Sequence, residues 1–340
     1  MIFFSKKNFK NFFVFFFSVI FIVLVLELFI LFILGDKPRD NLKIKLNEKP
    51  IPFIEDEILG WKPKPGEFIF SPWSIDGEKT TLTNLKDGSR LTGNIDKKNK
   101  IIFVGGSLTQ GWAVSDNETY PALLQNKIKN YKIKNYGVGG YGGTQSFLKL
   151  KNIFKVQRNV KLVIYGFIPH HEIRNIAAGS WMYLLKQNSK GTKGELSLPY
   201  ASIKNDKIII KKPKKYFTLP YGDKSALITK IEKKILKIES LQRSREKTKI
   251  SKKIILNMNE IAKTNKAKFM FLFLNVDELP EKQFTAYKEF LENENIVYIE
   301  CQFPLGKKYI VTGEGHPNKM AHKSISECVH KKLSLTLDKL

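Results

Sequence analysis

Hydrophobic and polar residues follow three different patterns along this chain of 340 residues. Residues 1–35 are almost entirely apolar after a short basic start, and residues 36–98 are mostly polar with scattered Pro and Gly. Residues 99–340 alternate short apolar runs with segments of helical periodicity. The pattern therefore predicts an N-terminal transmembrane anchor, a connector, and an α/β domain.

Five short apolar runs in the third region predict strands. They are Lys100–Val104, Lys132–Tyr136, Leu162–Ile168, Lys268–Leu274 and Asn295–Glu300. Leu162–Ile168 is apolar throughout, as expected for a strand that is buried on both faces of a parallel sheet. Helical segments between the runs give repeated βα units, which imply a parallel sheet of about five strands with helices on both faces.

Four segments of the same region predict helices, and one break interrupts the rhythm. The first helix is capped by Asn117 and runs through Leu124 to Ile128. The others are Thr144–Phe154, Ser225–Lys263, and Lys319–Leu333, of which the last is capped by Asn318. Residues 176–222 break the alternation, and we expect there an insertion of loops and short strands such as Lys207–Lys211.

The connector carries strand signals at Glu67–Phe70 and Thr80–Thr83. The stretch Asp56–Gly66 is rich in turn residues and includes one large aromatic residue, Trp61. We therefore expect the connector to pack on the α/β domain rather than to fold alone.

The apolar segment Phe12–Leu34 contains one charged residue, Glu27. About twenty apolar residues suffice for a helix to cross a bilayer, and the three lysines before the segment favour a cytoplasmic N-terminus. A cleaved signal peptide is the alternative, but it would have a shorter apolar region followed by small residues, and Phe32–Asp36 offers no such site. We expect a single-pass anchor in the inner (cytoplasmic) membrane, with the α/β domain periplasmic or extracellular. We interpret Glu27 as tolerated in so apolar a helix or as paired with a partner helix.

The charge of the chain is strongly positive, with 58 basic against 32 acidic residues and a net charge of +26. Only six of the basic residues are Arg, the residue that most often reads phosphates and bases, so the excess of Lys does not indicate a nucleic-acid partner. Attraction to anionic lipid or acidic polysaccharide fits this composition better.

No spacing in the chain indicates a metal site or a cofactor. The two cysteines, Cys301 and Cys328, lack the spacing of zinc ligands, and the sequence leaves open whether they form a disulfide. Gly137–Gly142 matches the glycine pattern of dinucleotide-binding loops. That pattern needs an acidic residue about twenty positions later at a strand end, and Pro169-His170 stands there instead.

Three short segments carry the candidate chemistry: Gly105–Gly111, Asn135–Gly140 and Glu314–Asn318. Ser107 follows a predicted strand, and its hydroxyl is a nucleophile only if a neighbouring base takes its proton. His316 is the candidate base, and Glu314 is the candidate acid that orients the imidazole and stabilises its cation. We expect folding to bring these groups together as the parts of an acyl-transfer site.

An acyl-transfer site also needs hydrogen-bond donors for the oxyanion that forms during the reaction. The backbone N–H groups of Ser107 and Gly140 are two candidates. For the third donor we expect the side chain of His170, with His171 as the next choice. Ser107, Gly140 and His170 each follow a predicted strand, so all three can lie at the carboxyl edge of the sheet.

These segments resemble the SGNH (GDSL-type) hydrolase superfamily, especially its membrane-anchored bacterial members. The similarity lies in residues 101–124, in 135–145, and in 314–318 together with His322. The resemblance implies a flavodoxin-like three-layer α/β/α sandwich, with Ser107 as nucleophile, His316 as base, and the Ser107 and Gly140 amides as oxyanion donors.

Three residues depart from the pattern of that superfamily. Gly106 replaces the usual Asp, His170 stands where the third block normally has Asn, and Glu314 replaces a second Asp. The resemblance and the expected location together suggest a serine esterase or acyltransferase that acts on an acyl group, such as acetyl, esterified to a cell-envelope or extracellular polysaccharide. The alternative is a catalytically inactive envelope-assembly or glycan-binding protein.

Overall fold

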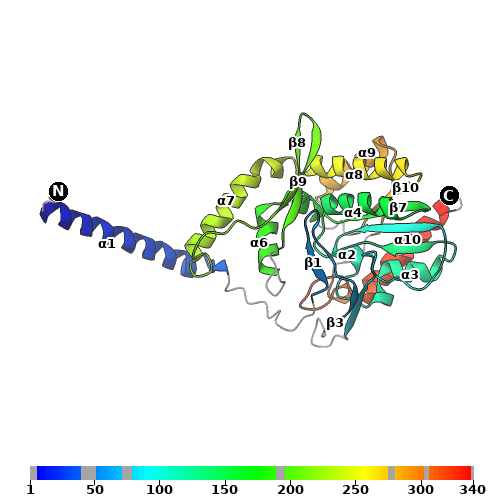
Figure 1. Cartoon of the computed structure of the whole chain (residues 1–340), viewed down its shortest axis with the longest axis horizontal. Helices are drawn as coiled ribbons and strands as arrows, with labels where there is room; N and C mark the ends of the chain where they lie inside the picture. Colours follow the sequence, from blue (N-terminus) through cyan, green and yellow to red (C-terminus); the bar gives the residue numbers. More distant parts are fainter. Residues whose placement is uncertain are drawn as a thin grey trace.

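Five parallel strands form the centre of the molecule (Figure 1), in the spatial order β11-β10-β7-β5-β6. The computed structural model describes residues 6–39, 51–70, 79–188, 196–274, 280–301 and 306–337. The strands are β5 (Lys100–Gly105), β6 (Lys132–Asn135), β7 (Val160–Phe167), β10 (Lys268–Phe273) and β11 (Val297–Glu300). All five predicted strands are confirmed, with ends within two residues of the predicted ones.

The order of these strands creates a crevice at one edge of the sheet. Counted along the chain, the five strands have the order 2-1-3-4-5, which is that of flavodoxin-like folds. β5 lies between β6 and β7. The chain therefore passes from β5 to β6 on one side of β5, and then crosses to β7 on the other side. Ligands of such sheets bind at the carboxyl ends of the strands at this switch point.

Helices cover both faces of the sheet, which confirms the predicted three-layer fold. On one face, the apolar sides of α4 (Gly143–Val156), α8 (Lys247–Thr264) and α9 (Glu281–Asn293) pack on residues such as Val104 and Phe271. On the other face, α3 (Tyr120–Lys127) and α10 (Lys319–Leu337) pack on residues such as Phe103 and Leu272.

Two of the predicted helix boundaries are wrong. α3 is capped by Thr119, whose hydroxyl accepts the N–H of Ala122, whereas Asn117 lies in the short 3-10 turn η3 (Asp116–Glu118). Pro121 explains the later start, because a residue without an N–H fits best in the first turn of a helix. The long helix predicted over Ser225–Lys263 is two helices, α7 (Ala226–Arg245) and α8, which are separated by Glu246.

The insertion contains more regular structure than its sequence predicts. After α5 (His171–Asn175), the chain forms α6 (Gly179–Asn188) and an antiparallel hairpin of β8 (Leu198–Lys204) and β9 (Lys207–Lys214). Part of the insertion, residues 189–195, lies outside the described residues, as do residues 40–50 and 71–78 of the connector.

The connector forms two antiparallel strand pairs beside the carboxyl edge of the sheet. They are β1 (Phe53–Asp56) with β2 (Gly60–Pro63), and β3 (Gly66–Phe70) with β4 (Thr80–Asn84). Trp61 is buried, and its indole N–H donates a hydrogen bond to the carbonyl of Gly139 at 3.1 Å. Arg90 is also buried, and its guanidinium donates to the carbonyls of Gln110 and Gly111. Both side chains thereby hold the loops that follow β5 and β6.

The apolar N-terminus forms the helix α1 (Lys6–Leu28), continued by the π-helical turn η1 (Phe29–Ile33). The span Phe9–Ile33 is long and apolar enough to cross a membrane, with a mean hydropathy of 3.1. Glu27 contacts the chain's own α7, because its carboxylate accepts hydrogen bonds from the Ser225 hydroxyl and from the Ala226 and Leu227 N–H groups. This acid therefore satisfies unpaired donors at the start of a helix.

Cys301 and Cys328 form a disulfide, with their Cα atoms 5.7 Å apart. The bond links the chain just after β11 to the middle of α10. It therefore fixes the helix that follows the loop of His316 against the last strand of the sheet.

His322 is fully buried in α10, and its Nδ1 atom accepts the N–H of Tyr120 at 3.2 Å. This contact joins α10 to the start of α3. Burial lowers the pKa of His322 to about 3, and the charges of Arg90 and His316 act in the same direction. The ring is therefore neutral over most of the pH range in which the fold is stable.

We predict that His322 makes the fold sensitive to acid. The pKa of this ring is lower in the folded chain than the ordinary value of 6.5, so the stability present above pH 6.5 is lost as the pH falls toward the folded value. The maximum slope is about 1.4 kcal/mol per pH unit, because the unfolded chain binds a proton that the folded chain excludes. His322→Asn keeps an acceptor for Tyr120 and should flatten this dependence in urea titrations of the full chain in detergent.

His330→Asn, on the same helix, is the matched control for removing a histidine. If the unfolding free energies of His322→Asn and of the unsubstituted chain ran parallel from pH 6.5 to about 4.5, His322 would not be the sensitive group.

Candidate active site

Ser107 lies at the point where strand β5 ends and the short helix α2 (Ser107–Gln110) begins. The chain passes from the strand to the helix through Gly105 and Gly106, and Ser107 is the first helical residue. Its side chain is largely buried, with 5% of the residue exposed. The strand therefore delivers the hydroxyl to the carboxyl edge of the sheet, beside the switch point.

His316 lies in a tight turn between η4 (Lys307–Tyr309) and α10. The backbone of Val311 pairs with that of His316, and Asn318 donates to the Tyr309 carbonyl, so the turn is closed at both ends. The side chain of Asn318 then accepts the N–H groups of Met320 and Ala321, as predicted for the cap of the last helix. The imidazole is consequently held in place by backbone contacts on both sides.

The structure brings Ser107, His316 and Glu314 together. The Nε2 atom of His316 lies 2.9 Å from the hydroxyl oxygen of Ser107, and its Nδ1 atom lies 2.7 Å from a carboxylate oxygen of Glu314. The second oxygen of Glu314 accepts the backbone N–H of His316 at 2.9 Å. This order of hydroxyl, imidazole and carboxylate is the arrangement in which an imidazole can activate a serine.

Glu314 is ionised in this arrangement. Burial alone would raise its pKa, but hydrogen bonds from the His316 ring, the attraction that this ring exerts when it is protonated, and hydrogen bonds from the His316 backbone and the Trp112 side chain together lower the pKa below its usual value. The carboxylate therefore keeps its negative charge beside the imidazole and favours a proton on Nδ1. That tautomer leaves the lone pair of Nε2 directed at the Ser107 hydroxyl.

Gly140 lies in the loop after β6, next to the end of β5. Two residues before it, the N–H of Val138 donates to the carbonyl of Gly105 at 3.1 Å. Gly140 has a φ of +80°, and a Cβ atom there would lie 3.0 Å from the Trp61 ring, so glycine is required both by the backbone and by the space. Among the described residues, the N–H groups of Ser107 and Gly140 have no acceptor.

Gly106 is closely surrounded by side chains from the loop after β7. A Cβ atom at this position would lie 2.7 Å from the Nε2 atom of His171 and 3.1 Å from a guanidinium nitrogen of Arg174. These two side chains therefore leave no space for a side chain at position 106, and an Asp there would overlap them. Positions 106 and 171 are thus linked in space, which the sequence alone does not reveal.

His171 is fully buried beside the candidate nucleophile. Its Nδ1 atom lies 2.7 Å from the Tyr165 hydroxyl, and its Nε2 atom has no partner among the described residues. Burial lowers the pKa of His171 well below its usual range, and the charges of Arg174 and His170 act in the same direction. The ring is therefore neutral.

The contact with Tyr165 indicates which nitrogen of His171 carries the proton. Burial raises the pKa of Tyr165, so its hydroxyl keeps its own proton. If this hydroxyl donates to Nδ1, only the Nε2–H group stays unpaired, whereas the opposite direction leaves both the hydroxyl proton and Nε2 unpaired. Unpaired buried polar groups are costly, so we assign the proton to Nε2, on the side of Gly106.

His170, the donor expected from the sequence, occupies a different environment. It precedes α5 as the N-cap residue, and its side chain is exposed. His171 begins the helix and points inward, where its Nε2 atom is the nitrogen near Gly106. A run of two histidines contains no signal for which of them turns inward, because this depends on where the short helix begins.

Aromatic side chains from the connector and the insertion surround these groups. Trp112 stacks on Phe53 with ring centres 6.1 Å apart, and it also hydrogen-bonds to Glu314. On the other side, the Arg174 guanidinium lies 4.3 Å from the centre of the Trp181 ring. Large planar side chains therefore line the site on two sides, while the side chains of His316 and Glu314 remain partly exposed.

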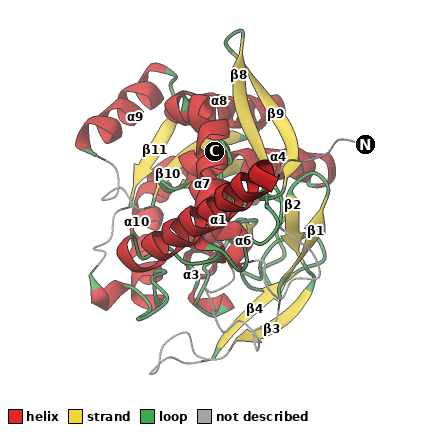
Figure 2. Cartoon of the chain, turned by 90° about the vertical axis from the view of Figure 1, so that its left-hand side faces the viewer, coloured by secondary structure: helices red, strands yellow, loops and turns green. Residues whose placement is uncertain are grey.

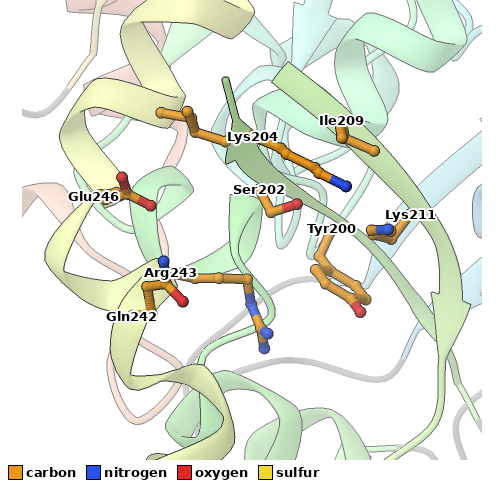
Figure 3. Close-up of a pocket in the computed structure, with 9 residues that line it drawn as sticks. Tyr200, Ser202, Lys204, Ile209, Lys211, Gln242, Arg243 and Glu246 are labelled. Atoms are coloured by element: carbon orange, nitrogen blue, oxygen red, sulfur yellow. The ribbon is translucent and has the colours of Figure 1, made fainter. Parts of the chain in front are cut away.

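A separate hollow lies away from this site, between the β8–β9 hairpin and the end of α7 (Figure 3). Its volume is about 290 Å³, and Tyr200, Lys211 and Arg243 are among the residues that line it. Arg243 stacks on Tyr200 and donates to the carbonyl of Ile176 at 3.0 Å. Its guanidinium thereby joins α7 to the insertion.

No protein-family model matches the sequence, and no curated protein matches it significantly. Solved structures with a similar course of the chain include a lipolytic protein of the G-D-S-L family from Veillonella parvula, with 12% identity, a TM-score of 0.41, and coverage of 70% of this chain and 99% of the other. A GDSL-like lipase from Bacteroides thetaiotaomicron has 12% identity, a TM-score of 0.39, and coverage of 70% and 89%. The acetyl xylan esterase Est2A from Butyrivibrio proteoclasticus has 11% identity, a TM-score of 0.40, and coverage of 78% and 68%. At such low similarity, we base neither the fold nor the function of this chain on them.

We predict that Gly106 tolerates no side chain. In Gly106→Ala the new methyl group would lie 2.7 Å from the His171 ring, and the packed surroundings leave it no room to move. Overpacking of this kind lowers the free energy of unfolding by about 1 to 3 kcal/mol, which thermal unfolding of the full chain in detergent would detect. Gly306→Ala is the control, because none of the residues that the structure describes comes within 4 Å of a Cβ atom there. Equal melting temperatures for the two variants would contradict the crowded geometry.

Proposed function

We propose that the chain is a serine esterase or acyltransferase. The observation that carries the proposal is the continuous hydrogen-bonded path from Ser107 through His316 to Glu314, with distances of 2.9 Å and 2.7 Å. A serine hydroxyl in a merely structural role has no need of an imidazole that is directed at it and paired with a carboxylate. The Ser-His-Glu arrangement is supported by the geometry of side chains that lie more than two hundred residues apart in the sequence.

The reaction would proceed through an acyl-enzyme. His316 takes the proton of Ser107 at Nε2 while the serine oxygen attacks the ester carbonyl, and the carboxylate of Glu314 stabilises the imidazolium. The tetrahedral intermediate collapses when His316 returns that proton to the departing alcohol oxygen, which leaves the acyl group on Ser107. Attack by water then gives hydrolysis, and attack by a sugar hydroxyl gives transfer, with the same groups acting in reverse.

The oxyanion of this intermediate would lie among three donors. Two are the backbone N–H groups of Ser107 and Gly140, as the sequence suggested. For the third we propose the Nε2–H group of His171 in place of His170, because it is buried, neutral and next to Gly106. A fixed donor in a site that excludes water stabilises developing charge more than a mobile donor in solvent does.

The location of this activity is proposed from the N-terminal half of the structure. Glu27 caps α7, and Arg39 forms an ion pair with the buried Glu232 on the same helix. Cleavage after the apolar segment would remove Glu27 and leave the first N–H groups of α7 without this acceptor, so we propose that α1 remains as a single-pass anchor in the inner membrane with its N-terminus inside. The disulfide supports a periplasmic or extracellular domain, since such bonds persist in oxidising compartments. An acyl ester, such as acetyl, on a cell-envelope polysaccharide is the substrate class that we propose at this place.

We predict that Ser107→Ala abolishes labelling by a fluorophosphonate probe, because only an activated serine attacks such a phosphorus atom. His316→Ala should lower kcat on an aryl acetate by about a thousandfold or more, with the melting temperature preserved. Ser334→Ala, an exposed serine on α10, is the control. A folded wild-type chain that never reacts with the probe would favour the inactive binding protein instead.

We also predict that the two adjacent histidines differ in their effect on turnover. His171→Phe keeps a planar ring but removes the donor, and it should lower kcat about a hundredfold with little change in KM, because the donor acts on charge that exists only in the transition state. His170→Phe should leave kcat nearly unchanged. The opposite ranking, measured on the same aryl acetate with melting temperatures recorded for both variants, would restore His170 as the third donor.

A further inference from the structure

The outward face of α7 carries a stripe of large apolar side chains. Ile231, Ile235, Ile238 and Leu241 are between 40% and 63% exposed, and their spacing of three or four residues places them along one side of the helix. The opposite side packs on the protein through Leu236 and the buried Glu232. Four exposed branched side chains in line are unusual on a surface that only contacts water.

Lysines lie directly beside this stripe. Lys234 and Lys237 are exposed next to the apolar residues, and Lys230 binds Asp36 at 2.8 Å. An apolar stripe bordered by lysines is the composition of helices that lie in the interface of a membrane with anionic lipids. Lysines close to such a surface are attracted by its negative potential.

The position of α7 relative to α1 places this stripe at the level where the apolar helix ends. Glu27 caps the first turn of α7, so the two helices meet at that point. Figures 1 and 2 show α7 on the side of the body from which α1 projects, running across the direction of α1 rather than continuing it. In the loop just before α7, Phe217 and Tyr221 are 43% and 67% exposed, and aromatic residues of this kind are enriched at membrane surfaces.

We propose that α7 lies on the bilayer, with Ile231, Ile235, Ile238 and Leu241 in the headgroup region and Lys234 and Lys237 against anionic phosphates. The proposal rests on the anchor proposed above. A single transmembrane helix leaves the attached domain free to rotate about that helix and to lean away from the membrane. A second contact through α7 fixes the orientation of the domain, and with it the direction in which the Ser107 site faces.

A spin label at Ile238 tests this contact in the full chain. The two cysteines of the chain are joined in a disulfide, so Ile238→Cys introduces the one thiol available for labelling. The labelled chain is placed in nanodiscs of phosphatidylcholine mixed with phosphatidylglycerol, and collisions with oxygen are compared with collisions with a water-soluble nickel complex. Phe21→Cys, in the middle of α1, reports on the anchor, and Val156→Cys, an exposed apolar position at the end of α4, reports on water.

We expect the ratio of oxygen collisions to nickel collisions at the Ile238 label to lie between the ratios at the Phe21 and Val156 labels. Lys234→Glu together with Lys237→Glu should move the collision ratio at Ile238 toward that at Val156, because repulsion from phosphatidylglycerol moves α7 away from the bilayer. An Ile238 label that behaves like the Val156 label while Phe21 lies in lipid would overturn the proposal and leave the anchor intact. A Phe21 label in water would overturn both. Spectral broadening at Ile238 that disappears on dilution with unlabelled chain would assign the stripe to a second copy and would also overturn the proposal.

Discussion

The hydrogen bond between Ser107 and His316 is the contact on which the proposed chemistry of this molecule depends. Its two partners are 209 residues apart: Ser107 begins the short helix α2 after β5, and His316 lies in the turn before α10. The strand β5 presents the serine at the switch point of the sheet, and the turn before α10 presents the imidazole from the opposite side. The disulfide and the buried contact between His322 and Tyr120 fix α10 and thereby the turn.

A second constraint acts around Gly106. The space that a side chain would fill at this position is taken by His171 and Arg174 of α5, the short helix that follows the neighbouring strand β7. His171, the glycine at position 106, and Arg174, which stacks on Trp181, therefore pack against one another as one unit. This packing places the Nε2–H group that we propose as the third donor next to Gly106, the residue before the serine.

The sequence predicts the sheet well and the local details less well. The strands are identified because an apolar run such as Leu162–Ile168 can be buried on both faces only inside a parallel sheet. The position of α3 is missed because Thr119 and Asn117 are both good caps, and the proline two residues after Thr119 decides between them. The break at Glu246 has no sequence signal, since α7 and α8 share one continuous periodicity but pack on different surfaces.

Other features depend on contacts between distant segments and lie beyond any reading of local pattern. Glu27 looks like an isolated charge in an apolar helix until α7 brings its unpaired N–H groups within reach. The inward turn of His171 rather than His170 depends on where α5 begins, and the pairing of the two cysteines depends on how α10 packs against β11. In each case the residue is visible in the sequence, but its partner is not.

The central claim is that Ser107 becomes acylated during turnover. The most direct measurement is to mix the full chain in detergent with an aryl acetate, stop the reaction with acid during the first turnover, and identify the modified peptide by mass spectrometry. We expect one acetyl group on the peptide that contains Ser107 while product forms, and its loss once the aryl acetate is exhausted. Continued turnover with no acetyl group on that peptide, or with acetyl on a different residue, would contradict it.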